Sequence, residues 1–162
     1  MFKLFANQLI ILCPAEPVVV VAIFEDERRQ YGIVDLYGNY IIEPRYDTIR
    51  HYGTDNLHTR FHQGTPPPEP IFIEGMARVA NDGLWGFVDT AGSEVIPTQF
   101  QYVDVFMNGI ALVNYNGTWQ LIDLYGNILE SFTYSNMERL NANLLTFTDD
   151  NTTKEGLIRI LI

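Results

Sequence analysis

The 162-residue chain is long enough for one ordinary domain, and its apolar fraction of 47% excludes an intrinsically disordered protein. Its formal net charge of −10 argues against binding to nucleic acid or to an anionic membrane, because Lys and Arg make those contacts. Cys13 is the only cysteine, so we expect neither a disulfide within the chain nor a cysteine metal cluster. We therefore expect no cofactor and no resident metal.

The first predicted element is an N-terminal cap over residues 1–17. Short apolar runs at residues 2–5 and 9–12 flank a turn and end at a proline, which favours a hairpin. Asn7 and Gln8 interrupt the apolar run, so a secretory signal is the less favoured interpretation. No apolar run reaches transmembrane length. We expect a cytoplasmic protein, with export as the alternative.

Two strands are predicted next. Residues 18–24 form a continuous β-branched run between a proline and a charged stretch, which is typical of a buried strand. The charged stretch then turns the chain into a second strand over residues 31–36.

Three stretches share the residues of one hairpin turn: Asp35 to Gly38, Asp89 to Gly92 and Asp123 to Gly126. In each, the Asp side chain caps the turn and the Gly adopts the left-handed conformation. The second and third are 34 residues apart, and Asn143 fits a related glycine position one period further on, as the usual substitute at positive φ. We therefore interpret the three aspartates as turn residues rather than as a catalytic carboxylate site.

A fixed spacing of this kind indicates a repeat architecture, in which each unit buries its apolar face against its neighbours. The predicted fold class is all-β, with antiparallel β-hairpin repeats in a curved or twisted array and an N-terminal hairpin cap. The single repeat domain divides as follows: residues 1–17 the cap, 18–50 repeat 1, 51–74 an insertion loop, 75–108 repeat 2, 109–142 repeat 3, and 143–162 a partial C-terminal repeat.

The pattern of the second repeat carries a family resemblance. Gly75-Met76-Ala77-Arg78-Val79 precedes Leu84-Trp85-Gly86-Phe87-Val88-Asp89, and Val95-Ile96-Pro97 follows. The pattern resembles the bacterial WG-repeat (KWG-repeat) proteins over roughly residues 18–158. Tyr31 replaces the Trp of the first unit, Gln120 replaces the Gly of the third, and the usual lysine before Trp-Gly is missing. The resemblance implies a β-hairpin repeat fold, a bacterial source and a binding module, and it carries no established catalytic residues.

The insertion loop is the first candidate binding surface, because an insertion in a repeat array maps to a loop on one face. It holds all three histidines and a stiff proline run. His58 and His62 are four residues apart, but the glycines around them disfavour a helix, so we interpret the histidines as surface residues rather than metal ligands. The candidate residues are His51, Asp55, His58, Arg60, His62, Pro67 and Glu69.

The second candidate surface is acidic. No Lys or Arg lies between Arg78 and Arg139, whereas seven acidic residues do, and Asp82, Glu94 and Asp104 are the candidate contacts. A one-signed surface steers a basic partner toward it. The predicted function is a non-enzymatic protein-interaction module, in its sharpest form a small acidic immunity or inhibitor protein for a basic toxin or nuclease. The alternatives are a ligand- or glycan-binding accessory domain with exposed aromatics, and, more remotely, an enzyme that uses the histidine loop.

Overall fold

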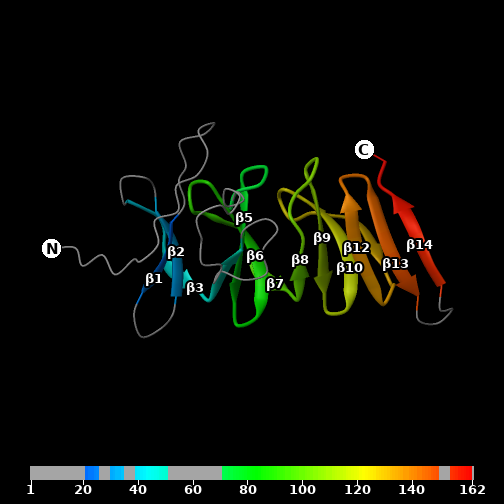
Figure 1. Ribbon diagram of the computed structural model, residues 1–162, viewed down its shortest axis with the longest axis horizontal. Coiled ribbons are helices and arrows are strands. Elements are labelled where there is room, and N and C mark those ends of the chain that lie inside the picture. Colours follow the sequence, from blue (N-terminus) through cyan, green and yellow to red (C-terminus); the bar gives the residue numbers. More distant parts are fainter. Residues whose placement is uncertain (1–20, 26–29, 35–38, 51–70, 150–153, 162) are drawn as a thin grey trace, which may run out of the picture.

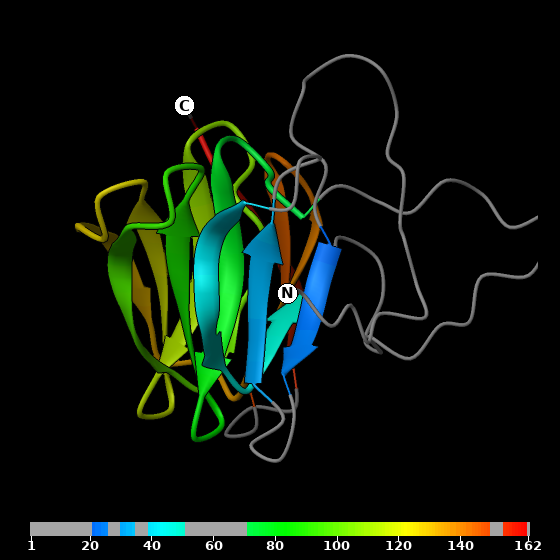
Figure 2. The same cartoon turned by 90° about the vertical axis from the view of Figure 1, so that its left-hand side faces the viewer.

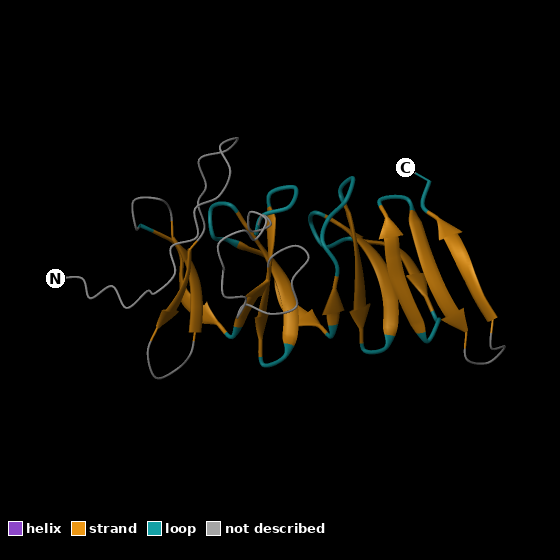
Figure 3. Ribbon diagram, in the orientation of Figure 1, coloured by secondary structure: helices purple, strands orange, loops and turns teal. Residues whose placement is uncertain are grey.

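The computed structural model describes residues 21–25, 30–34, 39–50, 71–149 and 154–161. These residues form four antiparallel sheets, which follow one another along the long axis of the molecule (Figures 1 and 3). Figure 2 looks along the array from the first sheet and shows the later sheets lying behind it. The described residues contain strands and no helix, so the predicted all-β hairpin array is confirmed.

The first two sheets contain seven strands. The first sheet has the order β1-β2-β3, and the second has the order β4-β5-β6-β7. The bounds are β1 Val21–Glu25, β2 Gln30–Val34, β3 Tyr40–Tyr46, β4 Thr48–Arg50, β5 Met76–Asn81, β6 Leu84–Asp89 and β7 Glu94–Phe100.

The third sheet has the order β11-β10-β9-β8, and the fourth has the order β12-β13-β14. Their bounds are β8 Tyr102–Val103, β9 Ile110–Tyr115, β10 Thr118–Asp123, β11 Ile128–Phe132, β12 Asn136–Asn141, β13 Leu144–Asp149 and β14 Lys154–Arg159. Only Asp47 separates β3 from β4, and only Gln101 separates β7 from β8. The chain therefore passes directly from the last strand of one sheet to the first strand of the next.

Alternation of side chains along the strands explains why the sheets stack. Ala77 and Val79 of β5 face the first sheet, where they join Ile33 and Ile42 in a buried cluster. Phe87 of β6 faces the opposite way, into a cluster between the second and third sheets. A further cluster, between the third and fourth sheets, contains Leu112, Trp119, Leu121, Met137, Leu145 and Ile160. Inner sheets are thus apolar on both faces, as a repeat array requires.

The glycine of the Trp-Gly pair is required by the packing of β7. Trp85 pairs with Phe100 and Phe87 pairs with Ile96, so three residues of β7 bulge opposite Gly86. A Cβ added to Gly86 would lie 2.5 Å from the Ile96 carbonyl oxygen and 2.7 Å from the Pro97 carbonyl carbon, both of them backbone atoms. Any larger residue would push the bulge away from the sheet.

The structure also shows where the predicted boundaries need correction. The predicted cap, the Asp35 to Gly38 turn and residues 51–70 of the insertion lie outside the described residues. Residues 71–74, predicted as loop, belong to the repeat instead: Ile71 is buried in the first cluster, and Ile73 forms a bridge with Met76. Residues 71–74 therefore pack as the corresponding residues of the third repeat do.

The prediction of positive φ at Asn143 is wrong. In the described chain the non-glycine residues with positive φ are Glu74, Asp82, Asn108 and Asn116, each followed by a glycine with positive φ. Such pairs form the two-residue type I′ hairpin that matches strand twist. At Asn143 the turn is built differently, because β12 has a bulge between Arg139 and Asn141 and the Asn141 side chain accepts the Asn143 N–H.

The last strand of the fourth sheet departs from the repeat sequence. Gly156 pairs with Phe147, as Gly86 pairs with Val79, so Lys154-Glu155-Gly156 occupies the place of the Trp-Gly segment. Glu155 therefore stands where β6 and β10 carry tryptophan. Leu157 stands where Leu121 is buried, and it is 62% exposed. The outer face of the fourth sheet therefore carries both a charged residue and an exposed leucine.

Candidate functional site: acidic turns, a buried ion pair and the β10–β11 hairpin

Seven of the residues predicted to bind a partner lie outside the described residues. They are His51, Asp55, His58, Arg60, His62, Pro67 and Glu69. The other three predicted residues, Asp82, Glu94 and Asp104, lie within the described residues.

The turn aspartates have the predicted structural role. The Asp89 carboxylate accepts the backbone N–H groups of Ala91 and Ser93 at 2.9 and 2.8 Å, so it caps its own turn. Asp123 does the same with the N–H groups of Tyr125 and Asn127, and it also accepts the Asn127 side-chain amide at 2.8 Å. The Asn127 side chain, followed by the backbone donors, lowers the pKa of Asp123. Both carboxylates thus stabilise turns.

Asp82 and Glu94 lie at opposite ends of the second sheet. Asp82 is in the turn between β5 and β6, whereas Glu94 begins β7 beyond the next turn, and consecutive antiparallel turns lie at opposite ends. The backbone N–H of Asp82 donates to the Asp47 carboxylate at 2.7 Å, and its own side chain is exposed. The two candidate residues therefore do not share one contact surface.

Glu94 is part of the junction between the first and second sheets. Its carboxylate accepts the hydroxyl of fully buried Tyr46 at 2.9 Å, and Arg45 donates to the Gly92 carbonyl at 3.2 Å. Burial raises the pKa of Tyr46, and the hydrogen bond with Glu94 adds to the rise against the opposing effect of Arg45. These bonds hold the β6–β7 turn against β3.

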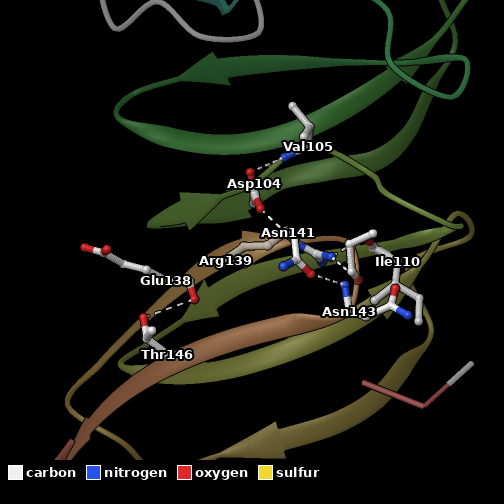
Figure 4. Close-up of polar contacts among 9 residues, drawn as sticks. Asp104, Val105, Ile110, Glu138, Arg139, Asn141, Asn143 and Thr146 are labelled. Atoms are coloured by element: carbon white, nitrogen blue, oxygen red, sulfur yellow. Dashed lines mark hydrogen bonds and ion pairs between the residues drawn. The ribbon is translucent and has the colours of Figure 1, made fainter. Parts of the chain in front are cut away.

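Asp104 is paired with a basic residue that lies outside the acidic stretch in sequence. It lies just after β8, and its carboxylate is 2.9 Å from the guanidinium of Arg139 on β12 (Figure 4). The Arg139 side chain is only 2% exposed and also donates to the carbonyls of Ala142 and Ile110. A one-signed surface that includes Asp104 is therefore not what the structure shows: folding brings Arg139 across from the fourth sheet.

A polar contact between the second and third repeats was missed by sequence reasoning. The Glu74 carboxylate accepts the N–H groups of Asn108 and Gly109 at 2.7 and 2.8 Å, and the Asn108 amide donates to the Asn143 side chain at 3.3 Å. These residues occupy corresponding turns in consecutive sheets. Their spacing of 34 or 35 residues was the signal that could have revealed this contact.

The tryptophans belong to the packing of the array. Trp119 is 7% exposed and lies edge-on to Tyr102, with ring centroids 5.4 Å apart. Trp85 is half-buried against the second cluster, and the Arg50 guanidinium lies 4.3 Å from its ring centroid. Both tryptophans therefore take part in the packing between neighbouring sheets.

The β10–β11 hairpin carries apolar side chains on its surface. Tyr125 of the turn is 80% exposed, and Ile128 and Leu129 of β11 are 58% and 51% exposed. Asp123 and Glu130 lie in the same hairpin, in the stretch without Lys or Arg. The corresponding residues of β7 are Glu94, Val95 and Ile96, of which Ile96 is buried. The sequence signal for this difference is that residues 128–131 read Ile-Leu-Glu-Ser, whereas the corresponding residues 94–97 read Glu-Val-Ile-Pro.

The described ranges contain neither a cluster suited to a metal ion nor a membrane-spanning helix. No group of three or more His, Cys, Asp or Glu residues there could hold a metal ion. In the same part of the chain, no helix is long and apolar enough to cross a membrane.

Comparison with known proteins agrees with this architecture. A family model described as WG containing repeat matches residues 31–57 and 85–119. The second match begins at Trp85 and ends at Trp119, one period later, and the first begins at Tyr31, the residue in the tryptophan position of β2. No curated protein and no solved structure matches the chain. Two segments of the chain, residues 31–57 and 85–119, therefore match the WG-containing repeat.

Proposed function

We propose that this protein is a non-enzymatic protein-interaction module that binds a partner with a basic surface. The observation that carries the proposal is the β10–β11 hairpin, where Tyr125, Ile128 and Leu129 are exposed and Glu130 follows them in the same hairpin. Apolar side chains rimmed by charge are the composition of a protein contact surface rather than of a solvated face.

The roles of the other acidic groups support the same proposal. Asp89, Glu94 and Asp104 all bind groups of the array itself, so their carboxylates serve structure. The stacked sheets give a preformed surface, which binds without the entropic cost of ordering a loop. The insertion at residues 51–70 remains a second proposed contact, on its sequence alone.

The test is capture of a partner followed by a binary measurement. Tagged protein is incubated with a lysate of the source organism, and any captured protein is purified and titrated against it. We expect a protein of basic isoelectric point, and a dissociation constant that rises roughly tenfold when salt is raised from low to physiological strength. A captured partner whose affinity is insensitive to salt would contradict the proposal.

The finer form of the proposal is an acidic inhibitor that neutralises a basic toxin or nuclease, supported by the net charge of −10. A captured partner should then arrest growth when expressed alone and lose this effect when both proteins are expressed together. The glycan-binding alternative has less support, because Tyr102 packs edge-on against Trp119, and Tyr115 packs edge-on against Phe100.

A further inference from the structure

The last strand of a complete repeat lies at the edge of its sheet, and two such strands, β3 and β7, have features that block pairing. Each carries a proline, Pro44 in β3 and Pro97 in β7, and proline cannot donate to a neighbouring strand. Each also bulges opposite a glycine of the adjacent strand. Prolines and bulges are the features by which natural sheets prevent an edge from pairing with another chain.

A turn of the next sheet packs against each of these strands. The turn glycine Gly92 of the second sheet lies against the Ile41 carbonyl of β3. A Cβ built on Gly126, in the turn of the third sheet, would lie 3.4 Å from the Ile96 side chain of β7. As a result, Ile42 and Ile96 are 1% and 2% exposed.

β11 has less of this protection: it lacks the proline and the three-residue bulge, and it keeps only a one-residue bulge at Leu129, between the Leu121–Glu130 and Ile122–Ile128 pairs. Its sequence Ile-Leu-Glu-Ser-Phe has no proline, and Trp119, Gln120 and Leu121 pair in regular register with Phe132, Ser131 and Glu130. Gln120 is accommodated in the glycine position because no bulge lies opposite it. No described turn covers the strand, and none of its five residues is buried.

We propose that β11 is a strand-addition site, at which an extended segment of a protein partner pairs with the free edge of the third sheet. The segment carries apolar residues and at least one basic residue, because β11 presents the exposed apolar side chains of Ile128 and Leu129 together with Glu130. Main-chain hydrogen bonds supply affinity in such sites, and side-chain contacts supply specificity. This inference rests on the proposed function and assigns it a location and a binding mode.

The probe for the test is an acetylated peptide of ten residues that alternates lysine and valine. Its binding is followed by fluorescence anisotropy, and hydrogen exchange of the full chain reports where it binds. We expect exchange at residues 128–132 to slow roughly tenfold at saturation, with no change over β3 and β7. The same peptide with alternate amides N-methylated cannot pair with an edge, and it should bind at least about tenfold more weakly.

A matched pair of variants tests the location. Leu129→Lys adds a positive charge on β11, and Gln99→Lys adds the same charge at an exposed position of β7. We expect Leu129→Lys to weaken peptide binding about tenfold and Gln99→Lys to leave it within about twofold. Circular dichroism of both variants verifies that the sheets are retained.

Three outcomes would overturn the inference. They are equal binding of the N-methylated peptide, equal effects of the two lysine variants, and a dimer of this chain that Leu129→Lys abolishes, which would make a second copy the occupant. If the peptide does not bind but a captured partner still binds in a salt-dependent way, the location is wrong and the proposed function stands. If no partner binds in a salt-dependent way, the proposed function fails even where the peptide binds.

Discussion

The two junctions of the third sheet are built differently. The junction with the second sheet is an apolar cluster, and its edge strand β7 is bulged, proline-bearing and covered by the turn at Gly126. The junction with the fourth sheet contains the Asp104–Arg139 ion pair, and its edge strand β11 has no proline, pairs in regular register from Glu130 to Phe132, and has no buried residue. The same repeat pattern thus forms one junction whose edge strand is packed under a turn and another whose edge strand is exposed in the described chain. The difference depends on a few substitutions.

Val105 and Arg139 illustrate the difference at one position. They are 34 residues apart and hold equivalent places, yet one is an apolar side chain, Val105, 4% exposed, and the other is the charged side chain of Arg139, buried beside a carboxylate. A buried charge requires its partner, whereas a buried valine requires only volume. The fourth sheet is therefore attached to the third by a specific polar contact as well as by apolar packing.

The largest expected effect comes from breaking the ion pair at the junction with the fourth sheet. Asp104→Ala leaves the Arg139 guanidinium buried without its carboxylate, and we expect a loss of about 3 kcal/mol in the free energy of unfolding. Urea denaturation measures it. The double variant Asp104→Leu with Arg139→Met should recover most of the loss, because apolar groups of similar volume can replace a buried pair. A loss below about 1 kcal/mol in the single variant would show that the pair is not needed for attachment.

The next largest effect is expected from a substitution opposite the three-residue bulge of β7, compared with the equivalent substitution opposite β11. Gly86→Ala places a Cβ 2.5 Å from the Ile96 carbonyl oxygen, so β7 must shift, and we expect a loss of about 2–3 kcal/mol. Gln120→Ala is the matched control in β10, where no bulge lies opposite, and it should stay within about 0.5 kcal/mol of the wild type. Equal losses in the two variants, measured in urea, would mean that the bulge does not impose the glycine.

The smallest effect concerns the turn that joins the two junctions. The Asn127 amide is the main cause of the lowered pKa of Asp123, so Asn127→Ala should raise that pKa toward its ordinary value of 3.8. Because the folded pKa is depressed, the stabilisation by this carboxylate is full above the ordinary value and is lost as pH falls through the folded pKa. Carbon-detected NMR titration measures the shift. Tyr125→Ala should not change it, because Tyr125 contributes only its backbone N–H.

Much of the fold could be predicted because the same turn and strand patterns recur in each repeat. Aspartate and glycine four positions apart predict a capped turn whatever surrounds it, and the structure confirms this at Asp89 and Asp123. A continuous apolar run predicts a strand that is buried on both faces. The fourth Trp-Gly position was missed, because Gly156 lies 36 residues after Gln120 and Glu155 replaces the tryptophan.

The candidate site could be predicted only in part. The sequence shows which residues are charged, but it does not show which partners folding brings next to them. The interval without Lys or Arg suggested one acidic surface, yet Asp104 is neutralised by Arg139 and Glu94 is bound to Tyr46. The open edge of β11 could not be read from Ile128 and Leu129 either. Exposure there depends on whether a neighbouring turn covers the strand, which is a property of the stacked sheets.

The sequence by itself determined the strands, the turns, the period of the array and its acidic character, because these depend on contacts between residues near one another or on simple counts. Only the tertiary structure decided which carboxylates are paired and which side chains of the described edge strands are exposed. Those outcomes depend on contacts between residues of different sheets, such as Asp104 with Arg139 and Gly126 with Ile96. The exposure of the β11 side chains likewise depends on how the neighbouring sheets pack against them.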